Sequence, residues 1–157
     1  MLNPLTLRDE LLALAPTNSE ASAIDTLSNA YATYALGAEA GGVTITPAGV
    51  DLGKAALKPA LVGMSASGAG LSIIPAALLA FWVAVAAGLA TSFVGATLIT
   101  PPPHAGLAAA FAALMPLNTA GNISKADAVL SVANMFHAAA IVGGTVTFPG
   151  PIVAPIL

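Results

Sequence analysis

Histidine is the residue type in this sequence best suited to acid–base chemistry or metal binding, and it occurs twice, as His104 and His137. A metal site or a general base needs further ligands or a carboxylate at the same point, often at the spacing of His-x₃-His. His104 follows three prolines, and His137 lies in a helical pattern without such a partner. We therefore interpret both as structural histidines and predict no metal site and no catalytic residue.

The carboxylates do not supply a catalytic pair either. Asp9 and Glu10, like Glu20 and Asp25, are typical of solvated positions near helix N-termini, where the helix dipole favours negative charge. A general acid and base must converge on one cleft, and no spacing here indicates that. The chain also has no cysteine, which excludes disulfides and thiolate chemistry. We expect a protein that is not an enzyme.

Cofactor binding is equally unsupported by the motifs. The glycine-rich stretch GMSASGAG at 63–70 lacks the spacing of phosphate-binding loops, and it predicts a turn between two helices. Lys54 and Lys58 lie four residues apart on one helix face, which indicates a solvated face or, alternatively, contact with lipid headgroups beside a membrane segment. We predict no cofactor.

Composition restricts the class of partner. The net charge is −3 with only four basic residues, so the chain lacks the positive patch that nucleic acid requires. Hydrophobic residues make up 57% of the chain and charged residues 7%, whereas soluble domains carry about 25% charged residues. The surface therefore needs cover, either from other protein subunits or from lipid.

The first residues predict no cleavable signal peptide, because Arg8, Asp9 and Glu10 fall where such a peptide would need its apolar stretch. The compartment remains undetermined by the sequence, since cysteine usage gives no redox information.

The longest apolar run covers residues 73–99, inside a stretch from Pro59 to Ser124 that has no Asp, Glu, Lys or Arg. It exceeds the roughly 20 residues that span a bilayer, so a membrane helix is one interpretation. Small residues also recur every four positions along it, a pattern that lets two helix backbones approach closely. These residues are Ala76, Ala80, Ala84, Gly88, Ser92 and Ala96.

An internal repeat argues for a different interpretation. GGVTITP (41–47), GATLITP (95–101) and GGTVTFP (143–149) are similar, and the first and last follow related helical segments at 19–36 and 124–141. In that alignment Ser19 matches Ser124 as a helix N-cap and Tyr31 matches Phe136. The helix of the first unit contains charged residues, so this position in the repeat does not require lipid.

We therefore predict a mainly α fold of three diverged helix-turn-helix units of about 50 residues. Each unit ends in a short extended Gly-Gly-β-Pro segment, because glycine ends a helix, β-branched residues favour extension and proline stops the strand. The units cover about 1–47, 48–101 and 102–157 of a single domain. We expect the extended segments to pair with one another or with those of neighbouring chains, in a pseudo-threefold or stacked arrangement.

The most consistent function is a non-enzymatic structural subunit of a large ordered assembly, such as a component of a virion, a tail or an injection machine. It would pack through Ala/Gly-rich helices and short strands against other protein subunits, in a homo-oligomer or a multi-component complex. The alternative is an integral membrane subunit anchored by residues 73–99. The residues we expect at packing and interface positions are Ala76, Ala80, Ala84, Gly88, Ser92, Trp82, Tyr31, Phe136, Gly143, Gly144, Thr147 and Pro149.

Overall fold

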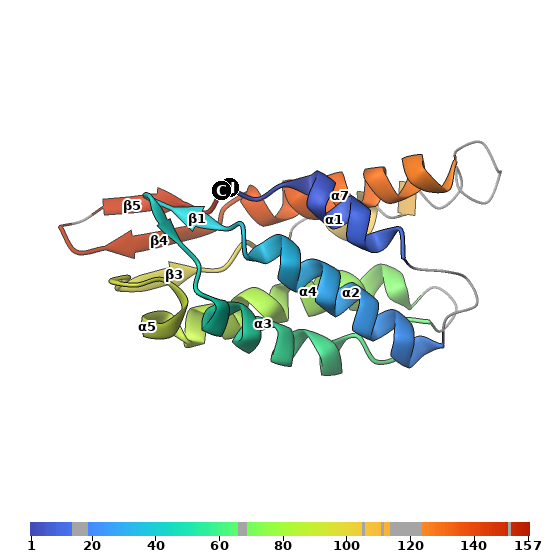
Figure 1. Ribbon diagram of the computed structural model, residues 1–157, viewed down its shortest axis with the longest axis horizontal. Coiled ribbons are helices and arrows are strands. Elements are labelled where there is room, and N and C mark those ends of the chain that lie inside the picture. The colour runs from blue at the N-terminus through green and yellow to red at the C-terminus, as the bar shows by residue number, and fades with distance from the viewer. Residues whose placement is uncertain (14–18, 66–68, 105, 111, 114–123, 151) are drawn as a thin grey trace.

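The computed structural model describes residues 1–157 except 14–18, 66–68, 105, 111, 114–123 and 151. The described chain is mainly helical and contains two small antiparallel sheets, which confirms the predicted fold class at this level. The long helices lie side by side, and the strands gather at one end of them (Figure 1).

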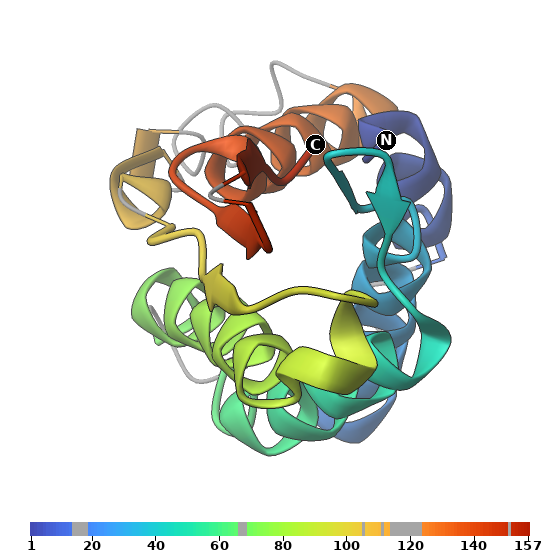
Figure 2. The ribbon, with the colours of Figure 1, turned by 90° about the vertical axis from the view of Figure 1, so that its left-hand side faces the viewer.

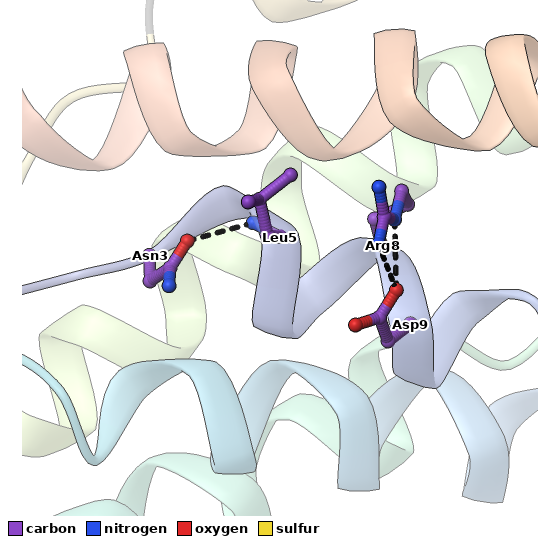
Figure 3. A network of polar contacts seen from close by, with 4 residues as sticks. All are labelled: Asn3, Leu5, Arg8 and Asp9. Carbon is purple, nitrogen blue, oxygen red and sulfur yellow. Dashed lines mark hydrogen bonds and ion pairs between the residues drawn. The ribbon is translucent and has the colours of Figure 1, made fainter.

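The first two helices, α1 (Pro4–Leu11) and α2 (Glu20–Ala35), start at side-chain caps. Asn3 Oδ1 accepts a hydrogen bond from the Leu5 amide at 2.9 Å, and Ser19 Oγ accepts one from the Ser22 amide at 3.2 Å. Figure 3 shows the Asn3 cap together with the Arg8–Asp9 ion pair on the exposed side of α1. The predicted cap at Ser19 is confirmed.

The next two helices, α3 (Pro47–Ala60) and α4 (Gly70–Ala87), form the tightest helix pair. Thr46 caps α3 by accepting from the Gly49 amide at 3.0 Å, and Pro47 occupies the first turn, where its missing N–H has no cost. The segment after α3 is a turn, as predicted for 63–70, although residues 66–68 lie outside the described part.

Residues 73–99 do not form the single long helix of the membrane alternative. Helix α4 ends at Ala87, a short helix α5 (Leu89–Ser92) follows, and the chain then turns into strand β3 (Leu98–Thr100). The break lies at Gly88, where Thr91 Oγ1 donates to the Gly88 carbonyl at 2.8 Å. Glycine and hydroxyl side chains that bond to local carbonyls both weaken a helix, and hydropathy alone does not register either effect.

The last helix, α7 (Lys125–Ile141), begins at the predicted cap, where Ser124 Oγ accepts from the Asp127 amide at 3.1 Å. Before it, residues 107–110 and 112–113 are helical, in the part of the third predicted unit that should contain its first helix. Residues 111 and 114–123, between this region and α7, lie outside the described part.

The smaller sheet is a hairpin of β1 (Glu39–Ala40) and β2 (Val43–Thr44). Gly41 and Gly42 form its two-residue turn with φ of +58° and +83°, a conformation that suits a type I′ turn and favours glycine. A short strand follows the first Gly-Gly motif as predicted, but the two glycines form a hairpin turn instead of ending α2, and Pro47 is the first residue of α3. The prediction for this first segment was wrong in that detail.

The larger sheet has the order β3-β4-β5, with β4 (Thr145–Phe148) in the centre and β5 (Ile152–Pro155) at one edge. The β3–β4 pairing joins the extended segments of the second and third predicted units, with Ile99 opposite Val146. The first unit does not join this sheet through a strand. Its β1 contacts the chain end instead, because the backbones of Glu39 and Leu157 exchange hydrogen bonds of 3.0 and 2.8 Å.

The core lies inside a ring of helices when the molecule is viewed from the strand end (Figure 2). Around the ring α7 packs on α1, α1 on α2, α2 on α3 and α3 on α4. The six largest fully buried side chains are aromatic and come from α2, α4, α7 and the turn after α5: Trp82, Tyr31, Tyr34, Phe81, Phe93 and Phe136.

Candidate functional site

Three buried polar side chains from different parts of the chain meet in this core. Trp82 Nε1 of α4 donates a hydrogen bond of 2.8 Å to the hydroxyl of Tyr31 in α2. The same hydroxyl lies 3.4 Å from Nε2 of His104, and His104 Nδ1 lies 2.9 Å from the Pro102 carbonyl oxygen. Because all three side chains are at most 4% exposed, their polar atoms depend on one another for hydrogen bonds.

The direction of these hydrogen bonds follows from what each group can donate. The Pro102 carbonyl only accepts, so His104 donates from Nδ1, and a neutral imidazole then accepts at Nε2. Tyr31 accepts from Trp82 and donates its own proton to His104. Burial lowers the pKa of His104, with the Pro102 hydrogen bond as a smaller opposing effect, and burial raises the pKa of Tyr31.

His104 also has an unusual backbone, because its φ of +51° is left-handed for a residue with a side chain. The segment that contains it is held closely on the other side. A Cβ on Gly144 would lie 2.9 Å from Pro102 Cγ, and one on Gly143 would lie 3.1 Å from Pro103 Cδ. The third Gly-Gly motif therefore permits a close approach between the end of α7 and residues 102–104.

A second tyrosine and the second histidine form a separate pair. Tyr34 Oη lies 2.9 Å from His137 Nδ1, and their rings meet edge to face at 6.1 Å. Burial lowers the pKa of His137 and raises that of Tyr34. His137 lies on α7, and its side chain is half-buried against α2.

Charged groups do not gather in a site. Lys58 pairs with Asp25 at 2.6 Å on the surface between α3 and α2, and Glu20 accepts from the Gly63 amide at 2.6 Å. Among the residues that the structure describes, no three side chains of His, Cys, Asp or Glu are grouped to hold a metal ion. Lys58, Asp25 and Glu20 thus take part in surface contacts of α2 with α3 and with the turn that follows α3.

The surface feature with the clearest pattern is the outward face of the three-stranded sheet. Leu98, Thr147 and Val153 lie directly opposite one another on β3, β4 and β5, and Leu98 and Val153 are 57% and 60% exposed. The alternate row, Ile99, Val146 and Ala154, is buried. We call the outward row and its neighbours Thr100, Thr145 and Pro155 the outer sheet face; it contains no charged side chain.

The predicted packing residues fall into two groups. Tyr31, Trp82, Phe136, Ser92 and Gly144 are buried, and the Tyr31 and Phe136 rings lie 6.2 Å apart. The others are at or near the surface: Ala76, Gly143 and Pro149 are exposed, while Ala80, Ala84, Gly88 and Thr147 are partly buried.

The close approach of α3 to α4 and α5 brings the predicted packing residues Ser92 and Gly88 against residues of α3 that are outside the predicted set. A Cβ on Gly49 would lie 2.6 Å from Ser92 Cα, and one on Gly53 would lie 2.6 Å from Phe81 Cε2. Gly88 faces Leu52 of the same interface. The i, i+4 spacing of Gly49 and Gly53 was the available signal, because small residues four apart line one helix face.

An apolar groove lies beside the last helix. This groove of about 260 Å³ lies between α7 and residues 106–110, lined among others by Leu107, Met135 and Val142.

Within the described ranges, none of the helices combines the length and hydropathy needed to cross a bilayer.

Comparison with known proteins adds no relative: the chain matches no family model, and neither a curated protein nor a solved structure is significantly similar to it.

Proposed function

We propose that this chain is a non-enzymatic structural subunit of a large ordered protein assembly, and that copies of it make contact through the outer sheet face. The observation that supports this most directly is the row Leu98, Thr147 and Val153, which is in register across three strands and in which Leu98 and Val153 are more than half exposed. An antiparallel sheet with one face in water usually presents polar residues on that face. This one presents leucine, valine, proline and threonine.

The distribution of charge supports the same surface. Every Asp, Glu, Lys and Arg of the sequence lies on α1, α2, β1, α3 or the first turn of α7. The strands β3, β4 and β5 have none, although exposed strands are commonly protected from association by charged side chains. The side of the ring that carries charge therefore faces water, and the uncharged sheet is the part that needs cover.

Contact through the face of the sheet fits better than extension at its edges. Pro101 follows β3, and Pro155 lies within β5 at one edge. Proline has no N–H to offer an added strand, so each edge can take part in only a few further backbone hydrogen bonds. Side chains of the outer sheet face can instead pack against an apolar surface without backbone pairing.

The three-unit organisation is part of this proposal. It is supported by the order α1, α2 and the β1–β2 hairpin in the first predicted unit and α3, α4, the short α5 and β3 in the second, and by the contact of the matched residues Tyr31 and Phe136 in the core. We infer that the units arose by duplication and that their extended segments share one end of the molecule for contact. Thr147→Pro removes a backbone N–H from the central strand β4, and assembly that persists unchanged in this variant would contradict the role of strand pairing.

The main experiment measures the mass of the purified chain by light scattering after size-exclusion chromatography. We expect an oligomer from the wild type and a monomer from the double variant Leu98→Lys/Val153→Lys, because two ammonium groups on the outer sheet face oppose its burial. Val62→Lys is the matched control, since Val62 is 66% exposed but lies in the turn after α3. A monomeric wild type, or a double variant that assembles like the control, contradicts the proposal.

Carbonate extraction followed by ultracentrifugation separates this function from the membrane alternative. An assembly subunit is expected in the supernatant after expression without detergent. Retention of the chain in the membrane pellet would overturn the proposal in favour of an integral membrane subunit.

A further inference from the structure

The Trp82–Tyr31–His104 chain of hydrogen bonds is complete in only one protonation state. With neutral His104, each donor has an acceptor: Trp82 donates to Tyr31, Tyr31 to Nε2, and Nδ1 to the Pro102 carbonyl. A protonated His104 would present a donor at both ring nitrogens. Tyr31 would then accept from two donors, and its own hydroxyl proton would lose its acceptor while fully buried.

Protonation of His104 is also unfavourable because the groups around its imidazole are uncharged. The groups that meet His104 are the Tyr31 hydroxyl from α2 and the Pro102 carbonyl of its own segment, with Trp82 of α4 behind Tyr31. The ring neighbours of Tyr31 are Tyr34, Phe81 and Phe136, none of which is charged in the neutral pH range. Among the described residues no carboxylate pairs with His104, so nothing there compensates a positive charge.

Among the described residues, the segment that bears His104 also accepts a hydrogen bond of 3.4 Å from the Leu107 amide at the His104 carbonyl. Residues 102–104 rest on Gly143 and Gly144 through proline rings, and the left-handed φ of His104 is unfavourable unless its surroundings maintain it. The hydrogen bond with Tyr31 joins the His104 side chain to α2, whereas the bond to Pro102 lies within the segment itself. Loss of the Tyr31 hydrogen bond would leave the segment with its local hydrogen bonds, its apolar contacts and an unfavourable left-handed φ.

We propose that His104 is an acid-sensitive latch, which holds the segment after β3 in the helical core when neutral and releases it when protonated. In the released state the imidazole reaches water, and the core around Tyr31 and Trp82 opens. This inference is independent of the assembly function, since it concerns the closed and open states of one chain.

The sign of the pH dependence follows from the lowered pKa. In the open state His104 titrates near its ordinary value of about 6.5, and in the closed state its pKa is lower. The open state therefore binds more protons between these two values, and the latch loses stability as the pH falls below about 6.5. Above that pH its full contribution is present.

Trp82 is the only tryptophan in the chain, so its fluorescence reports directly on the core beside the latch. We expect the emission of the full-length wild type to shift to longer wavelength with a midpoint below pH 6.5. His104→Asn is the informative variant, because asparagine tolerates a left-handed φ but does not titrate. In this variant the transition should disappear from the range of histidine titration, while His137→Asn, the matched control, should retain it.

Three results of that experiment would overturn the proposal: a wild type with no transition, an unchanged transition in His104→Asn, or a transition abolished by His137→Asn. Should His104→Asn fail to fold, Tyr31→Phe provides the test. Removing the hydroxyl deprives the neutral imidazole of its donor, so we expect the midpoint to move to higher pH. A midpoint that stays in place or moves to lower pH would contradict the latch.

A measurement on the unmodified protein tests the geometry itself. Long-range ¹H–¹⁵N spectra of the histidine rings at neutral pH distinguish the two tautomers. We expect His104 with its proton on Nδ1, and we expect its ring to titrate together with the change in Trp82 emission. A proton on Nε2, or an imidazole that titrates at its ordinary pKa while Trp82 stays buried, would rule out the proposed latch.

Discussion

The aromatic core and the outer sheet face are both poor in charge, but they differ in how their contacts are completed. In the core, Tyr31 touches the rings of Phe81 and Phe136 and its hydroxyl has partners on two sides. On the outer sheet face, Leu98 and Val153 both lie opposite Thr147, but each remains more than half exposed. The contacts of the aromatic core are completed within the single chain, whereas the strands of the outer sheet face are covered by the chain on only one side.

This difference shows why composition alone does not locate an interface. Both regions contribute to the high hydrophobic content, yet only the exposed row of the sheet offers apolar area that a partner could still bury. Substitutions in the core should therefore alter the free energy of unfolding of the single chain. Substitutions on the outer sheet face should leave it nearly unchanged and alter association.

The largest effect is expected from Phe81→Ala, compared with Leu98→Ala. Phe81 is fully buried between Tyr31 and Trp82, so its removal leaves a cavity and should cost about 3–5 kcal/mol of unfolding free energy. Leu98→Ala should change it by no more than about 0.5 kcal/mol. Urea denaturation of dilute samples measures both, and similar losses in the two variants would contradict the distinction between core and outer sheet face.

Gly53→Ala should be destabilising although alanine is the better helix former. In an exposed helix this change gains about 0.5–1 kcal/mol, but here the new methyl group would meet the buried ring of Phe81 and should cost about 1–3 kcal/mol. Thermal unfolding measures the sign. Phe81→Leu provides space at this point, so the double variant should lose less than the sum of the two single variants.

Tyr31→Phe should cost about 1–3 kcal/mol, because it keeps the ring but leaves Trp82 Nε1 and His104 Nε2 without their buried partner. Tyr34→Phe is the matched comparison, in which the half-buried His137 retains access to water and the loss should be smaller. Urea denaturation at neutral pH compares the two variants. Equal losses of unfolding free energy would mean that the Trp82–Tyr31–His104 chain of hydrogen bonds contributes no more to stability than the Tyr34–His137 pair.

The smallest effect is expected at the charged surface opposite the sheet. Lys58 lowers the pKa of Asp25 by hydrogen bonding and by its charge, and the charge of Lys54 lowers it to a smaller extent. This contribution to stability is present above the ordinary carboxyl pKa and is lost as the pH falls through the lowered value. Lys58→Met should raise the pKa of Asp25 in an NMR titration while the unfolding midpoint barely moves, since exposed ion pairs contribute little.

Local signals in the sequence were sufficient for the helix starts. Ser19 and Ser124 cap α2 and α7 as predicted, because a hydroxyl before an apolar helical pattern meets the free amides of the first turn whatever surrounds the helix. The end of α4 was not found, because hydropathy treats residues 73–99 as uniform. The break at Gly88 depends on hydroxyl groups that bond to nearby carbonyls.

The candidate sites required contacts that are distant in the sequence. Trp82 and His104, the hydrogen-bond partners of Tyr31, lie 51 and 73 positions from it along the chain. No local sequence pattern could therefore connect these three residues. The outer sheet face likewise depends on the register of β3 against β4, which a shift of one residue would invert.

By itself, the sequence determined the mainly helical class, the caps, the scarcity of charge and the similarity of three Gly-containing segments, because these depend on residue type and short spacing. The tertiary structure decided what the segments do. Gly41–Gly42 forms a hairpin turn, Gly143–Gly144 admits Pro102 and Pro103, and the strand before Pro101 pairs with β4. The physical reason is that a turn or a close approach is set by what lies opposite a glycine in space, and similar residues meet different neighbours in each place.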